Sequence, residues 1–182
     1  SLDDPQYAPG GGMGANVFVF PGAARARLCR TPLDYDKWLP SVLFLTHYLP
    51  DDPAGSQMIN LASLILGQNG IWGDLPNVSE EGVSLFGEIL GRYKRVRADI
   101  TAADPVRKGV IGGSPEIHEK INPVTGRGAV CLFSPAAGRY SYVTDRRVVS
   151  SYWASDGVEV SFDADGRARI HVNLAEPGAA IV

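Results

Sequence analysis

Carboxylates are the side chains of this sequence with the clearest chemical potential, because a pair of them can act as acid and base on one bond. Asp34 and Asp36 flank an expected helix start, and Glu80-Glu81 falls in the first turn of another helix. Capping and the helix dipole explain acids at such places. Glu116 and Glu119 are an odd number of residues apart in an expected strand, so they face opposite sides. The sequence therefore identifies no catalytic pair.

The remaining reactive side chains favour neither metal nor cofactor chemistry. His47 falls in an expected helix, and His118 and His171 fall in expected strands, with no metal-ligand spacing between them. Nucleophile-elbow, phosphate-loop and dinucleotide patterns are absent from the sequence. Cys29 and Cys131 stand among apolar neighbours and are expected to be buried thiols. We expect no cofactor and no metal.

Composition narrows the range of partners. The 182 residues are 45% hydrophobic and 20% charged, which is enough to build one full domain or two small ones. The net charge of −3 argues against a nucleic-acid partner. The basic run Arg92–Arg97 falls at an expected helix end, where it would complement the dipole. Apolar runs stay below the ~18 residues of a membrane span, and Ser1–Asp4 lacks signal-peptide features. We expect neither nucleic-acid nor membrane partners.

The first half of the chain reads as α/β. Residues 1–14 are expected to be a linker, and residues 16–20 a buried strand. Residues 38–49 predict a mostly buried helix that ends at Pro50. Asp52-Pro53 is a helix start signal, and apolar residues at helical spacing follow until Gly67, although residues 64–66 also fit a strand.

A glycine-rich loop and the best helix of the chain come next. The loop is expected over residues 68–77. Ser79 is a helix cap with acids in the first turn, and this helix is expected to end before Asp104-Pro105. Its apolar face is predicted to consist of Val83, Phe86, Ile89, Leu90, Tyr93 and Val96.

After Pro105 the sequence consists of short runs in which apolar and polar residues alternate. Asp163–Gly166 predicts a hairpin between two of these runs, and residues 178–182 resemble a further strand. Strands at such spacing indicate an antiparallel sandwich or barrel. The predicted strands are 116–121, 128–133, 139–143, 158–162 and 168–174. The sequence thus predicts two units, residues 1–107 and 108–182.

One stretch resembles a known enzyme family. Residues 62–76, followed by the Ser79–Gly82 helix start, resemble the end of an α-galactosidase-like glycoside hydrolase. Residues 116–121 and 126–133 look like the opening strands of the sandwich that follows the barrel in that clan. The resemblance covers residues 55–182 and rests on the order of elements and on one loop.

The resemblance implies a fold and a site. The fold class would be α+β by segments, with a partial (β/α) barrel-type segment followed by an antiparallel β-sandwich. The catalytic carboxylates would come from earlier barrel strands. Trp72 would stack on a sugar while Asn69 and Asp74 bond its hydroxyls, at the barrel rim where such sites lie. Alternatively, Trp72 is a core anchor and Asp74 a turn residue.

Two other functions fit the sequence. A stand-alone carbohydrate-binding module would use Tyr140, Tyr142, Tyr152 and Trp153 as an aromatic platform, although Tyr140 and Tyr142 share a strand face and also fit a core. A purely structural β-domain would bind nothing. In the hydrolase interpretation the partners are a carbohydrate and the missing N-terminal part of the barrel, or a second copy, since an uncovered sheet edge favours self-association.

Overall fold

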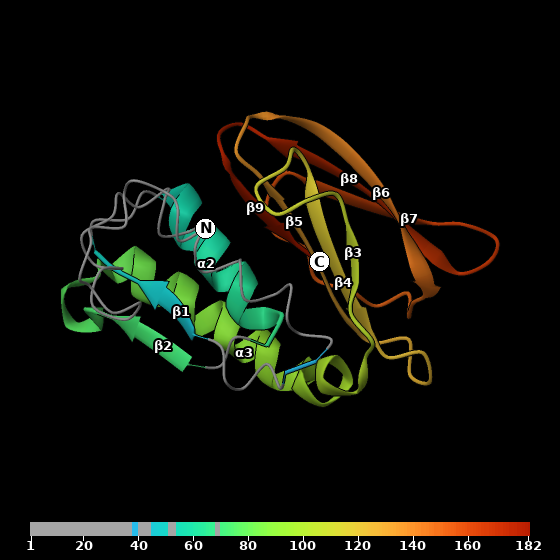
Figure 1. Cartoon of the computed structure of the whole chain (residues 1–182), viewed down its shortest axis with the longest axis horizontal. Coiled ribbons are helices and arrows are strands. Elements are labelled where there is room, and N and C mark those ends of the chain that lie inside the picture. The colour runs from blue at the N-terminus through green and yellow to red at the C-terminus, as the bar shows by residue number, and fades with distance from the viewer. Residues whose placement is uncertain (1–37, 40–44, 51–53, 68–69) are drawn as a thin grey trace.

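The computed structural model describes residues 38–39, 45–50, 54–67 and 70–182 (Figure 1). These residues form a mixed α+β structure in which two helices lie between a pair of parallel strands and two antiparallel sheets (Figure 1). The expected linker 1–14, the strand 16–20 and the Asp52-Pro53 start signal lie outside the described residues, as do Asp34, Asp36 and Cys29.

The two parallel strands are β1 (Leu45–Tyr48) and β2 (Gly70–Gly73). Leu45 is in register with Gly70 and Tyr48 with Gly73, so both strands end at one edge. The helix expected over residues 38–49 is therefore wrong at β1, and the loop expected over residues 68–77 is wrong at β2. A short apolar run fits either a helix or a strand, and here the pairing partner decides. Trp38 is 76% exposed, which also contradicts a mostly buried helix.

Helix α2 (Ala54–Ile65) supplies the crossover that parallel strands require. Its predicted end at Gly67 is confirmed, because Gly67 has φ 114° in the left-handed region. The strand alternative for residues 64–66 is wrong.

Helix α3 (Glu80–Ala102) begins as predicted, with the Ser79 side chain accepting a hydrogen bond from the Gly82 N–H at 3.1 Å. Two expectations about its surface are wrong. Val83 is 52% exposed rather than part of the buried face. The helix also continues to Ala102, so the basic run Arg92–Arg97 lies within it and not at its end.

The antiparallel part contains seven strands in two sheets. One sheet has the order β3-β4-β5-β9 and the other β6-β8-β7. The strands expected from alternation are confirmed, with the Asp163–Gly166 hairpin joining β7 to β8. The strand β3 was not expected from the sequence. The bounds are β3 Val106–Lys108, β4 Glu116–Ile121, β5 Gly128–Ser134, β6 Gly138–Arg147, β7 Val158–Phe162, β8 Arg167–Leu174 and β9 Gly178–Ile181.

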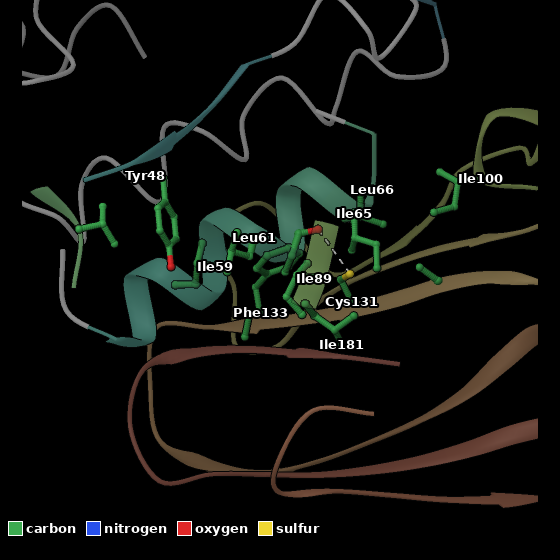
Figure 2. Close-up of a cluster of buried hydrophobic side chains, with 14 residues drawn as sticks. Tyr48, Ile59, Leu61, Ile65, Leu66, Ile89, Ile100, Cys131, Phe133 and Ile181 are labelled. Carbon is green, nitrogen blue, oxygen red and sulfur yellow. Dashed lines mark hydrogen bonds between the residues drawn. The ribbon is translucent and has the colours of Figure 1, made fainter. Parts of the chain in front are cut away.

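Two apolar cores hold these layers together. The first lies between the helices and the four-stranded sheet and includes Leu61, Ile89 and Phe133 (Figure 2). The second lies between the two antiparallel sheets and includes Leu132 and Ile170. Strand alternation makes this possible, since neighbouring residues of β5 point into different cores.

Polar groups of the four-stranded sheet also bind the backbone of α2 and the turn that follows it. Lys120 Nζ donates to the Leu66 carbonyl oxygen at 2.9 Å, just beyond the last residue of the helix. Cys131 Sγ donates to the Ala62 carbonyl oxygen at 3.5 Å (Figure 2). A cation at this end of a helix complements the helix dipole. The sheet therefore fixes both the position and the end of α2.

Gly73 provides a test of the β1–β2 pairing, because a Cβ there would overlap the Tyr48 carbonyl oxygen. We expect Gly73→Ala to lower the free energy of unfolding by about 2–3 kcal/mol through overpacking. The matched control is Gly87→Ala, on the exposed side of α3 with open space around it. That change should raise stability by up to about 1 kcal/mol. Urea denaturation followed by circular dichroism measures both, and equal stabilities of G73A and the parent chain would contradict the pairing.

Candidate functional site

Among the described residues, Asp74 is the acidic residue at the edge formed by the carboxyl ends of β1 and β2. It follows β2 directly, and its side chain is exposed. Asn77 Nδ2 donates to Asp74 Oδ2 at 2.7 Å, and the Asn77 N–H donates to the Asp74 carbonyl oxygen at 3.2 Å. These bonds close the short 3-10 helix η4 (Leu75–Asn77) and hold the carboxylate in one orientation.

Contacts with the first turns of α3 hold both the end of β1 and the residues that follow η4. Tyr48, the last residue of β1, donates its hydroxyl to the Gly82 carbonyl oxygen at 2.7 Å. Its ring lies 5.3 Å from that of Phe86. On the other side Val78 is buried and Ser79 caps α3. The first turns of α3 therefore hold the end of β1, next to which Asp74 lies.

Of the three residues predicted to bind a sugar, only Asp74 has a described side chain. Asp74 lies at the edge, as given above. Trp72 lies in β2 opposite His47, and only its backbone is described. Asn69 lies outside the described residues. Asn77 was not expected to take part, although an Asp followed three residues later by Asn is a spacing at which one turn brings the side chains together.

Glu116 is fully buried and belongs to the interior. It accepts a hydrogen bond from the Gly112 N–H at 2.7 Å, and its Oε1 lies 2.7 Å from His118 Nε2. These contacts order the loop between β3 and β4. Glu116 therefore contributes to the packing of the four-stranded sheet and not to an open site.

Glu119 points the other way from the same strand, as the odd spacing predicts. Its carboxylate accepts from the Tyr142 hydroxyl at 2.8 Å and from the N–H groups of Asp145 and Arg146 at 2.9 and 3.1 Å. Burial raises the pKa of Glu119, and these hydrogen bonds oppose the rise only in part. The group holds the bulged part of β6 against β4.

The four aromatic residues that would form a platform in a carbohydrate-binding module lie in two different parts of the structure. Tyr142 is buried in the second core, and Tyr140 packs against that core. The Tyr140 hydroxyl lies within 2.9 Å of the hydroxyls of Ser114 and Ser134. Tyr152 and Trp153 instead lie in the segment after β6. A single platform of all four is therefore wrong, because strand alternation turns Tyr140 and Tyr142 inward.

No group of three His, Cys, Asp or Glu residues in the described part of the chain is arranged to hold a metal ion. Cys131 is a buried thiol, as expected, and burial raises its pKa. Among the helices described, none has the length and apolar character needed to cross a membrane.

Comparisons with known proteins give no relatives. No protein-family model matches the chain, and no curated protein and no solved structure is significantly similar to it. The arguments for function therefore rest on the residues and their geometry.

Replacement of Glu119 by glutamine tests its role in the β-domain. We expect E119Q to lower the free energy of unfolding by about 1–2 kcal/mol near pH 4, because the amide cannot accept from every donor around it. A raised pKa means that the stabilising contribution of Glu119 is complete below its unfolded pKa of about 4.3 and is lost as pH rises through the folded pKa. The difference between the parent chain and E119Q should therefore shrink toward pH 7.

Denaturant titrations at several pH values measure this difference. Glu159→Gln is the matched control, since Glu159 is exposed on β7, and it should change stability by less than about 0.5 kcal/mol. A difference that grows as pH rises would show that the fold favours the ionised carboxylate instead.

Proposed function

We propose that this chain is the C-terminal part of a glycoside hydrolase similar to α-galactosidases, supplying the last unit of a (β/α) barrel and an accessory β-sandwich. The observation that carries the proposal is the order and pairing of β1, α2, β2 and α3, with Asp74 at the carboxyl edge of the strands. Parallel strands that alternate with helices are the repeat of such barrels, and barrel enzymes place their sites at that edge.

The proposed role of Asp74 is to bind sugar hydroxyls. A carboxylate has about four lone-pair positions, and the Asn77 amide uses one of them. The side chain is therefore held in place and retains acceptor capacity toward solvent. In this proposal Trp72 supplies a stacking surface and Asn69 a further hydrogen-bonding group at the same edge.

The proposal assigns bond cleavage to carboxylates upstream of the described strands. Glycosidases use two carboxylates on either side of the bond that breaks. Glu116 and Glu119 are buried and bonded within the β-domain, so they do not fit this role. The chain as given would bind and position substrate without completing catalysis.

The β-domain would support the barrel in this proposal. Its four-stranded sheet packs on α2 and α3, the helices that also pack on the parallel strands. The division near residue 107 would then separate the catalytic unit from its support. With the two antiparallel sheets packed on one core, the supporting unit fits a sandwich.

The test uses the polypeptide as its native source produces it, assayed on α-galactosides. We expect Asp74→Ala to reduce kcat/KM about tenfold, a loss of about 1.4 kcal/mol in transition-state stabilisation. Asp104→Ala is the control, because Asp104 is an exposed acid just beyond the other end of α3, and it should leave kcat/KM within about twofold.

Two results would contradict the proposal. Equal kinetics of D74A and D104A would remove Asp74 from the site. A native polypeptide of 19.5 kDa, the mass of the chain as given, would leave no room for a barrel. A stand-alone carbohydrate-binding or structural module would then be the better interpretation.

A further inference from the structure

A groove of about 480 Å³ opens where the second half of α3, the β4–β5 turn and the segment 148–153 meet. Its size lies within the range of small-molecule sites, about 300–1,000 Å³. It is separate from the Asp74 edge, because α3 runs from one to the other. Arg95 lies 15 residues after Glu80 on α3, which corresponds to roughly 22 Å along the helix axis.

The floor of the groove is apolar and comes from both antiparallel sheets. Ile121 and Val130 reach it from the four-stranded sheet, and Val160 and Ile170 reach it from the three-stranded sheet. The second core is therefore open to a ligand at this end. An aliphatic chain placed here would exchange water for the side chains of that core, which is favourable in proportion to the apolar area removed from water.

Aromatic side chains form one wall. Tyr152 is 52% exposed and Phe162 is 38% exposed, and their rings lie 6.0 Å apart. The guanidinium of Arg92 lies 4.9 Å from the centre of the Trp153 ring. Val149, which also lines the groove, is 41% exposed. This concentration of exposed apolar groups around a hollow is typical of a binding surface.

The charged side chains that line the groove are all basic. Three arginines line the groove, Arg92, Arg95 and Arg127, and its lining contains no Asp or Glu side chain. Arg92 pairs with Glu88 at 3.2 Å, and Arg127 lies 3.7 Å from Asp99. No ion pair of Arg95 is found among the described residues, and its carbonyl oxygen accepts from Arg127 Nη2 at 3.2 Å. The Arg95 side chain is exposed, so its guanidinium can bind a ligand.

We propose that this groove binds a monomeric aliphatic carboxylate, with the tail on the apolar floor and the carboxylate on Arg95. A guanidinium matches a carboxylate with two parallel hydrogen bonds. A neutral sugar would place hydroxyl groups against the aliphatic side chains of the floor, which is unfavourable. The tail enters between the two sheets, so the ligand is a single chain and not a lipid bilayer.

The experiment is isothermal titration calorimetry of the 182-residue chain with decanoate below its micelle concentration. Saturable binding is expected, with an affinity that decreases as salt increases. Decanol, which has the same tail without the charge, should bind at least about tenfold more weakly.

Two pairs of protein variants test the groove, one pair at the proposed carboxylate contact and one pair at the apolar rim. Arg95→Ala should weaken decanoate about tenfold, whereas Arg97→Ala, an exposed cation of α3 that does not line the groove, should leave it unchanged. Val149→Glu should abolish binding by placing an acid at the rim. Val110→Glu, at an exposed site away from the groove, should not. All four side chains are exposed or partly exposed, and circular dichroism confirms that each variant is folded.

Three results would overturn the proposal. The first is that decanoate shows no saturable binding. The second is that decanol binds as tightly as decanoate, or that R95A binds decanoate as tightly as the parent chain does. The third is that anionic phospholipid vesicles bind while monomeric decanoate does not. The last result would assign the groove to a membrane surface. None of these results bears on Asp74, whose variants test the hydrolase proposal separately.

Discussion

The burial of helix α2 is the constraint on which the rest of the structure depends. Every residue from Ile59 to Gly67 is buried, because β1 lies on one side of the helix while α3 and the four-stranded sheet occupy the others. Because α2 is packed on all these sides, its orientation in the structure is fixed. The parallel strands, and with them the edge that carries Asp74, take their place from α2 and α3.

Side chains from three strands donate hydrogen bonds to backbone carbonyl groups in and just after α2. Thr46 Oγ1 donates to the Asn60 carbonyl oxygen at 2.9 Å, while Cys131 and Lys120 bind carbonyl groups further along. A buried ammonium is costly unless it is well bonded, and the carbonyl groups at a helix end provide favourable partners. These polar contacts give the apolar core a single register, since sliding the helix on the sheet would break them.

Much of the antiparallel part could be predicted from the sequence, because its signals are local. Asp163–Gly166 encodes a tight turn, and the flanking strands alternate cleanly. Ser79 with its acids fixes the start of α3 in the same way. β1, β2 and β3 were missed because each is only three or four residues long and is defined by a partner distant in sequence. Secondary-structure propensity does not distinguish helix from strand in such short runs.

The candidate site was predictable only in part for the same reason. Asp74 could be singled out as a loop carboxylate, but its place at a strand edge depends on β2 pairing with β1. The bond from Asn77 also needs the 3-10 turn to form. The arginine-rimmed groove was not predicted as a site. The basic run Arg92–Arg97 and the aromatic residues Tyr152 and Trp153 were noted only separately, because the lining comes from distant stretches of the chain that only the packed sheets and α3 bring together.

Strand β9 has a consequence for how the protein is made. Ala179 and Ile181 complete the core around the helices, while Ala180 faces the core between the sheets. Pro177, just before this strand, lies against Gly55 at the start of α2. On the ribosome α2 therefore emerges long before the residues that cover it. The growing chain must carry uncovered apolar surface while the residues from α2 to β9 are made, which favours a late folding step and a need for chaperone protection.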